Sequence, residues 1–298
     1  MTPLSEWQID FAGVLIGHKT TVPTSNVEGL GPAELRTQDV PNPADDGAFP
    51  GVDLYAPRVI RIEAGIRTPG DPGAALDKLA EIEAVTSDAK IRRTAGALAM
   101  LRIRWPGRPT RVLFGRIRRA EAVSTADAIH GWIPLDLEFN ALDPRFHDDQ
   151  VSSVTLPLDI SQDNEGFAAP VQAPITTGIA KPETRPGWVV NDGKAGAWPS
   201  VRITGPVSNP RILHVESGRT LDLDITLGVG ERIDIETRPG TRWVLRNGSG
   251  NAASALSGAS RLDLFQIPPG RSEIRWTAAD YTNTTRLTVS WRSAWTAL

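Results

Sequence analysis

Arginines and paired carboxylates are the residues of this chain best suited to chemistry, and the arginines are the more concentrated. Ten Lys and Arg residues and no Asp or Glu lie between residues 90 and 119. Arg102 and Arg104 are two residues apart, as are Arg116 and Arg118, so each pair projects from one face of a β-strand. Such a basic stripe is typical of a surface that meets DNA or an acidic protein.

Three interpretations of the basic stripe are open from the residues alone. The arginines can pair across strands with Asp136 and Glu138, the outward residues of a strand over residues 133–140. They can instead face a neighbouring subunit, or bind nucleic acid. Sequence-tolerant binding of a nucleic-acid strand needs interleaved aromatic residues, and only Trp105 and Phe114 lie in the stripe. We therefore expect no specific nucleic-acid binding.

Acidic residues also form pairs, in Asp222/Asp224 and Asp234/Glu236. Such pairs suit calcium ligation or the two carboxylates of a glycosidase. Without an EF-hand-type ligand loop, however, the alternation favours the exposed faces of two strands. The four His residues are scattered singly, and no zinc-protease, nucleophile-elbow or phosphate-loop motif occurs. The sequence predicts no catalytic, metal or cofactor site, and hence no enzyme.

Composition sets the class of the protein. Apolar residues make up 40% of the 298, charged residues 22%, and the net charge is −3. These values predict an ordinary globular protein with room for two domains. Cysteine is absent, which excludes disulfides and thiolate metal sites. No signal peptide and no apolar run of membrane-spanning length is visible, so we expect no membrane association.

The first 160 residues read as β-structure with one helix. Asp71 is a suitable N-cap and Pro72 a suitable first helical residue, and an apolar stripe follows over a predicted helix at 72–85. Alternating apolar residues predict the strands. They are expected at residues 7–16, 59–67, 97–105, 110–118, 133–140 and 154–160.

Residues 36–57 interrupt this pattern. The segment contains Asp46, Gly47, Phe49, Pro50 and Tyr55, and its Pro, Gly and Asp content predicts no regular structure. A loop of this length in a compact domain is usually functional or disordered. With few apolar residues to hold it in place, it would suit a contact with a neighbouring subunit.

A proline-rich stretch at residues 161–187 predicts a linker. Beyond it, residues 188–298 show strict in–out alternation, most clearly at 221–227, 232–236 and 287–292, which predicts an antiparallel β-sandwich. Trp243, Trp276 and Trp291 lie at positions expected to face inward, although an exposed Trp platform would bind sugar. A carbohydrate-binding protein that attaches to host cell-wall glycan is therefore the alternative function.

Five stretches, in order along the chain, resemble the distal tail protein of long-tailed, non-contractile bacteriophages in its actinophage-like form. They are residues 4–13 (LSEWQIDFAG), 46–51 (DGAFPG), 139–146 (FNALDPRF), 198–210 (WPSVRITGPVSNP) and 291–295 (WRSAW). Each motif alone is weakly specific, whereas the ordered set covers nearly the whole chain.

This resemblance implies a mainly β protein with an N-terminal ring-forming domain at 1–160 and a C-terminal galectin-like sandwich at 188–298. It implies a homohexameric ring at the virion tail tip, assembled in the host cytoplasm, which joins the tail tube protein to a tail-associated hub or fibre protein. The family has no catalytic residues to carry over. The expected interface residues are Asp46, Gly47, Phe49, Pro50, Tyr55, Arg102, Arg104, Arg116 and Arg118.

Overall fold

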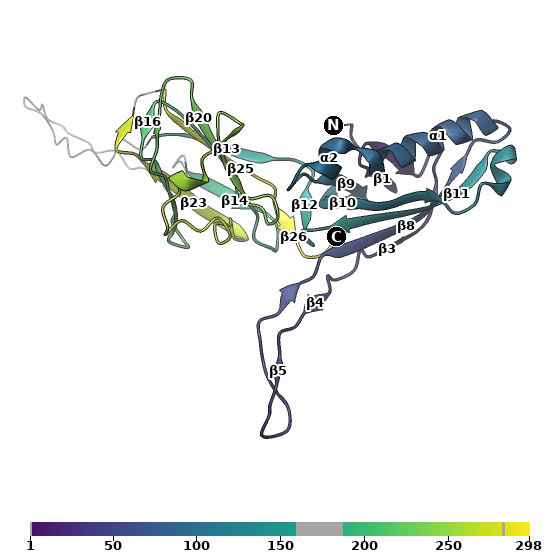
Figure 1. The fold of residues 1–298 in the computed structure, drawn as a ribbon, viewed down its shortest axis with the longest axis horizontal. Coiled ribbons are helices and arrows are strands. Elements are labelled where there is room, and N and C mark those ends of the chain that lie inside the picture. Colours follow the sequence, from purple (N-terminus) through teal and green to yellow (C-terminus); the bar gives the residue numbers. More distant parts are fainter. Residues whose placement is uncertain (1, 159–186, 282–283) are drawn as a thin grey trace, which may run out of the picture. The chain divides into compact units, whose positions relative to one another are not determined.

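The computed structural model describes residues 2–158, 187–281 and 284–298 (Figure 1). The chain divides into two compact units, one of Met1–Gln150 with Ala294–Leu298 and the other of Val151–Ser293. We expected the first domain to end at residue 160 and the second to run to the C-terminus. The division differs because residues 152–157 pair with a strand of the second unit, and residues 294–295 with a strand of the first. The expected linker at 161–187 lies outside the described residues, apart from Gly187.

The first unit is built on an antiparallel sheet with the strand order β2-β1-β9-β10-β11-β8-β3, in which β12 pairs with β10 and β26. Its strands are β1 (Gln8–Phe11), β2 (Val14–Gly17), β3 (Thr24–Glu28), β8 (Arg58–Arg67), β9 (Ala99–Arg104), β10 (Arg111–Ala122), β11 (Trp132–Ala141), β12 (Phe146–Asp148) and β26 (Ala294–Trp295). The single opening strand expected at 7–16 is a hairpin, β1–β2, because Gly13 has a φ of 105° and its N–H bonds to the Asp10 carboxylate.

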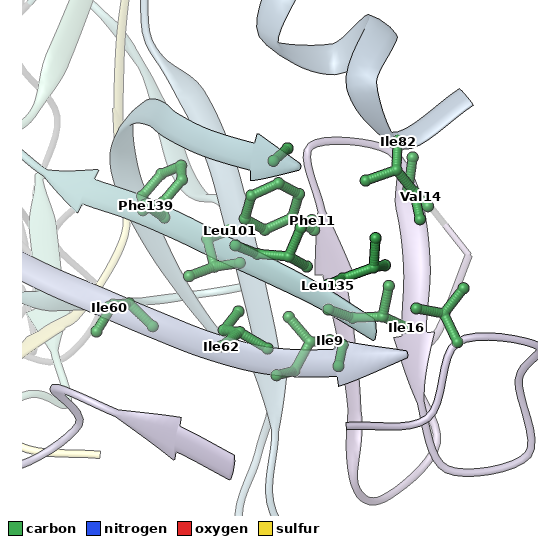
Figure 2. Close-up of a cluster of buried hydrophobic side chains, with 14 of the residues drawn as sticks. Ile9, Phe11, Val14, Ile16, Ile60, Ile62, Ile82, Leu101, Leu135 and Phe139 are labelled. Carbon is green, nitrogen blue, oxygen red and sulfur yellow. The ribbon is translucent and has the colours of Figure 1, made fainter. Parts of the chain in front are cut away.

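One face of this sheet is packed beneath α1 (Pro72–Ala84). The cap is the one expected, since the Asp71 side chain accepts from the Ala74 N–H at 2.9 Å. Ala75, Leu79 and Ile82 are buried, whereas Leu76, which also belongs to the apolar stripe, is exposed. Figure 2 shows Ile82 beside Val14 of β2, in a cluster that also contains Phe11, Ile62 and Leu101 from the strands. This cluster is the core of the first unit.

Among the described residues, three short helical elements complete the first unit, and none of them was predicted from the sequence. A 3-10 turn, η1 (Val85–Ser87), leads from α1 into the second helix α2 (Ala89–Arg93), which is capped by the Asp88 carboxylate. Another 3-10 turn, η2 (Ala126–His130), connects β10 to β11.

The segment at 36–57 is an extended hairpin rather than an irregular loop. It contains two short antiparallel pairs, the first between β4 (Leu35–Arg36) and β7 (Leu54–Tyr55), the second between β5 (Val40–Pro41) and β6 (Ala48–Phe49). Figure 1 shows it projecting from the β3–β8 side of the sheet.

The second unit has two main antiparallel sheets, ordered β13-β25-β15-β20-β21-β22 and β14-β23-β17-β18, and a small sheet β19-β16-β24. Its elements are β13 (Ser152–Pro157), β14 (Trp188–Asn191), β15 (Ser200–Thr204), β16 (Val207–Ser208), β17 (Arg211–His214), β18 (Arg219–Asp222), β19 (Thr226–Leu227), β20 (Arg232–Glu236), β21 (Trp243–Arg246), β22 (Gly250–Asn251), η5 (Ala253–Ala255), β23 (Gly270–Thr277), β24 (Asp280–Tyr281) and β25 (Arg286–Trp291).

Two tryptophans join the main sheets of the second unit. The indole N–H of Trp276, on β23, donates to the Pro157 carbonyl on β13 at 2.8 Å. In the opposite direction, Trp291 on β25 donates to the Val190 carbonyl on β14 at 2.9 Å. Both side chains are buried. The two sheets and the mainly β fold class expected from the alternation are confirmed. The strand expected at 221–227 is broken into β18 and β19, because Leu223 bridges to Leu256 instead.

Candidate interaction site

The hairpin of residues 35–55, here called the arm, is the most exposed part of the first unit. Every arm residue except Asn42 is exposed, including Phe49 at 57% and Tyr55 at 48% of their surface. Val40 and Phe49 are paired in register, so they share one face of the hairpin. Exposed apolar side chains gathered on one projecting element are typical of a surface that another protein covers.

The arm has no hydrophobic core, and local hydrogen bonds and glycine conformations define its hairpin structure. Asn42 N–H donates to the Gly47 carbonyl at 3.0 Å, and the Asp39 carboxylate accepts from Gly51 N–H at 2.8 Å. Gly47 has a φ of 98°, which favours glycine. A Cβ at Gly51 would lie 2.1 Å from the Gln38 carbonyl oxygen, so only glycine allows the two strands to approach there.

Arg58 fixes the root of the arm. Its buried guanidinium donates to the carbonyls of Gly29 at 2.7 Å, Gly31, Pro144 at 3.1 Å and Thr296 at 3.3 Å. It also lies 4.7 Å from the centre of the Phe146 ring. Burial lowers the pKa of Arg58. Arg58 was not among the predicted site residues, although the alternation of β8 places it in phase with the inward Ile60 and Ile62.

Of the two arginine pairs predicted in the basic stripe, Arg102 and Arg104 bind residues of the first unit itself. Arg102 is only 3% exposed and binds Asp149 at 2.6 Å and Asp10 at 3.1 Å. The hydrogen bonds that Arg102 donates to the Asp149 carboxylate are the largest of the effects that raise the pKa of Arg102. Arg104 donates to the Leu4 carbonyl at 3.1 Å. Arg102 is therefore not accessible to a partner, contrary to the expectation that placed it at an interface.

Arg116 and Arg118 differ from this pair. A register shift between Ile117 and Arg119 leaves Arg118 without a residue opposite it on β11, and its side chain is exposed. Arg116 donates to the Thr94 carbonyl at 3.1 Å. Of the expected cross-strand partners, Asp136 binds Arg119, the last residue of the stripe, at 2.6 Å, whereas Glu138 binds Arg61, outside the stripe, at 3.6 Å.

The unexpected helix α2 extends this basic area. Within the described part of the chain, neither the three cations of α2 nor Arg116 and Arg118 of β10 form an ion pair, unlike Arg111 and Arg119 of the same strand. We call this set the basic face, and it consists of Lys90, Arg92, Arg93, Arg116 and Arg118. Three of its residues, Arg92, Arg116 and Arg118, line a hollow of about 190 Å³, together with the apolar Val85, Ile91 and Ile117 and the acidic Asp88.

In the second unit, two of the acidic residues considered as calcium ligands or catalytic carboxylates form ion pairs with neighbouring arginines. Asp234 lies between Arg202 and Arg232, at 2.5 and 3.1 Å, and Asp222 pairs with Arg211. Trp243 was expected to face inward, but on β21, next to the edge strand β22, it is 39% exposed. Trp243, Trp276 and Trp291 therefore do not form a shared exposed platform.

Neither a metal cluster nor a membrane helix is found in residues 2–158, 187–281 and 284–298. No three acidic or His side chains there are grouped closely enough to hold a metal ion. None of the helices there is long and apolar enough to cross a bilayer.

Comparison with known proteins identifies a related family and solved structures of similar fold. Residues 192–295 match the family model of the siphovirus-type tail component, C-terminal domain. The match covers about a third of the chain. The resemblance to distal tail proteins of siphovirus-type phages, expected from the sequence, is confirmed. No curated protein matches the chain in sequence.

The fold of the whole chain also has solved counterparts. The Dit protein of phage SPP1, described as a paradigm of the hub adsorption apparatus in phages that infect Gram-positive bacteria, is 12% identical with a TM-score of 0.58. That match covers 96% of this chain and 98% of the SPP1 protein, so the two share a fold over nearly their full length. Two structures of the phage p2 baseplate in its activated conformation, with Ca and with Sr, are 11% identical, cover 91% of each chain and have a TM-score of 0.47.

Proposed function

We propose that this tail component is a structural, non-catalytic adaptor of the tail tip. In the proposal, six copies close into a ring in the host cytoplasm, and the ring joins the distal end of the tail tube to the tail-associated hub or fibre protein. The first unit forms the ring and the second, a galectin-like sandwich, carries the outward contacts. The similarity to the SPP1 protein, which belongs to a hub adsorption apparatus, supports this assignment.

The arm is the observation that carries the proposal. It presents exposed apolar side chains on a projecting hairpin, and the described residues of its own unit leave them uncovered. A hairpin of this kind and a separate receiving surface make a head-to-tail contact, and repeated head-to-tail contacts generate a ring when the rotation closes. A permanent joint of this kind would bury on the order of 2,000 Å² or more per contact.

Deletion of residues 42–52 tests the proposal. Because these residues form the outer half of an arm that has no core of its own, the variant should fold normally but remain monomeric. Size-exclusion chromatography with light scattering, in the presence of tube protein, should show a ring for the parent chain only. Val229→Ser, at an exposed turn of the second unit, is the matched control and should assemble normally. A deletion variant that forms rings of unchanged stability would disprove the role of the arm.

Binding of host cell-wall glycan is the second candidate function, and the half-exposed Trp243 favours it. A single exposed indole can stack on one sugar ring. If this function is real, the parent chain should sediment with purified cell wall and Trp243→Ala should not. Equal sedimentation of both proteins, or of neither, would contradict it.

A further inference from the structure

The proposed ring needs a receiving surface for the arm, and on the condition that the ring forms we propose that this surface is the basic face of the next copy. In this contact Phe49 enters the hollow beside α2, and Asp45 and Asp46 meet the surrounding arginines. The occupant is thus a second copy of the same chain.

Charge complementarity is the first argument. The arm contains four aspartates and one arginine, a formal charge of −3. Asp45 and Asp46 lie beside Gly47 at the turn between β5 and β6, and both are exposed. The basic face presents five cations without ion pairs among the described residues. Complementary potentials of this kind guide association and fix the register of a contact.

The size and lining of the hollow are the second argument. Its volume of about 190 Å³ exceeds the roughly 150 Å³ of an engineered apolar cavity that holds a benzene ring. Its lining combines the apolar Val85, Ile91 and Ile117 with three arginines and one carboxylate, that of Asp88, which accepts the Lys90 N–H as the cap of α2. An aromatic side chain flanked by carboxylates therefore suits both parts of the hollow, and Phe49 with Asp45 and Asp46 is such a group.

The position of the two surfaces within the first unit is the third argument. Figure 1 shows the arm leaving the sheet on the side away from α1 and α2. Each leg of the hairpin, about ten residues in extended conformation, reaches roughly 30 Å. Because the arm points away from the basic face of its own unit, it cannot cover that face, and contact with the basic face of another copy is head-to-tail.

Cross-linking tests the contact directly, because the natural chain contains no cysteine. Chains carrying Asp46→Cys are mixed with chains carrying Arg118→Cys, assembled with tube protein and treated with a short bis-maleimide. The control replaces the second chain by one carrying Ile129→Cys, at an exposed apolar turn of the same unit. We expect a cross-linked dimer for positions 46 and 118, and little for 46 and 129.

The outcomes separate this inference from the proposed function. If rings form but positions 46 and 118 do not cross-link, or 46 and 129 cross-link equally well, the receiving surface is wrong and the ring stands. If the parent chain stays monomeric with tube protein, both proposals are overturned.

Charge reversal provides a second measurement. Asp45→Lys with Asp46→Lys reverses the arm tip, and Arg92→Glu with Arg118→Glu reverses two exposed cations of the basic face. Each pair alone should raise the concentration needed for assembly about tenfold or more, and the four changes together should largely restore it. Arg219→Glu, an exposed arginine of the second unit, is the matched control. Failure of the combined variant to recover would overturn the contact.

Discussion

Tryptophan side chains link the sheets of the second unit through both their rings and their N–H groups. Trp276 and Trp291 bury large apolar surfaces, and each satisfies its polar atom on the opposite sheet. Loss of either ring would leave a large cavity and an unpaired carbonyl.

Trp291→Ala should therefore destabilise the second unit by roughly 3–5 kcal/mol. Chemical denaturation followed by tryptophan fluorescence or circular dichroism measures this change. The matched control is Trp243→Ala, at the exposed position, which should lose less than about 1 kcal/mol. A comparably small loss for Trp291 would show that its ring does not contribute to the core.

A buried histidine makes the stability of the second unit depend on pH. His214 is almost fully buried, and its Nδ1 accepts the Ser217 N–H at 3.2 Å. Burial lowers the pKa of His214, with the nearby Glu216 acting in the opposite direction. The unfolded chain thus binds a proton more readily than the folded chain does, near the ordinary histidine pKa of about 6.5.

The contribution of His214 to stability should be complete above that pH and decrease as the pH falls toward the lowered folded pKa. The slope should not exceed about 1.4 kcal/mol per pH unit, since a single proton is involved. His214→Asn keeps an acceptor for the Ser217 N–H but does not titrate. The difference between parent and variant, measured by urea unfolding from pH 7.5 to 5, should grow on acidification, and a constant difference would contradict this prediction.

At the scale of elements, the first unit depends on a strand from the far end of the chain. β26 pairs with β12, placing Trp295 opposite Phe146, and the Arg111 guanidinium lies 3.4 Å from the centre of the Trp295 ring. Arg58, at the root of the arm, also donates to Thr296. The five C-terminal residues are therefore part of the first unit.

Trp295→Ala should weaken the pairing of β12 with β26 by about 1–2 kcal/mol, because the cation–π contact and its apolar area are lost. Hydrogen exchange in the intact chain should show faster exchange at β12, while β15 and β20 of the second unit serve as the internal reference. Unchanged protection of β12 would mean that β26 does not support the sheet.

Elements with a local signal were predicted well. Alternation located β8 and β11 to within a residue or two at each end, and Asp71 and Pro72 located the start of α1. The hairpin structure of the arm was not predicted, because two short strand pairs connected by Pro- and Gly-rich turns give no alternation. α2 is a single five-residue turn, too short for an apolar stripe, although Asp88 is a suitable cap.

Partners distant in sequence were beyond prediction. The neighbours of Arg102 include Asp149, and no local pattern identifies a contact 47 residues away. The bulge that isolates Arg118 likewise depends on the register of β10 against β11. Local pattern therefore identified the arm and the arginines as candidates, but only the folded chain separates the buried Arg102 from the exposed Arg118.

At the scale of the whole molecule, β13 determines which fragment can fold alone. This strand pairs with β25 along its length, contributes the buried Leu156 and provides the Pro157 carbonyl for Trp276. A fragment of residues 188–298, the domain boundaries expected from sequence, lacks all of these contacts.

A fragment of residues 151–293 should unfold cooperatively on heating, whereas residues 188–298 should be less stable by several kcal/mol, since buried Leu156 and a core hydrogen bond are lost. Far-UV circular dichroism melts of the two fragments make the comparison. Equal melting temperatures would show that β13 is dispensable.

Because β12 pairs with β26, the chain leaves the first unit and re-enters it at neighbouring positions. The intervening 151–293 region is, in polymer terms, a loop whose ends are held together by the first unit. While that region is folded, its own structure limits the freedom of the loop. If it melts, β26 must close a flexible loop of about 140 residues, at an entropic penalty on the order of 4 kcal/mol. Melting of the second unit should therefore loosen the C-terminal strand from the first, so that thermal damage in one unit is transmitted to the other through chain entropy alone.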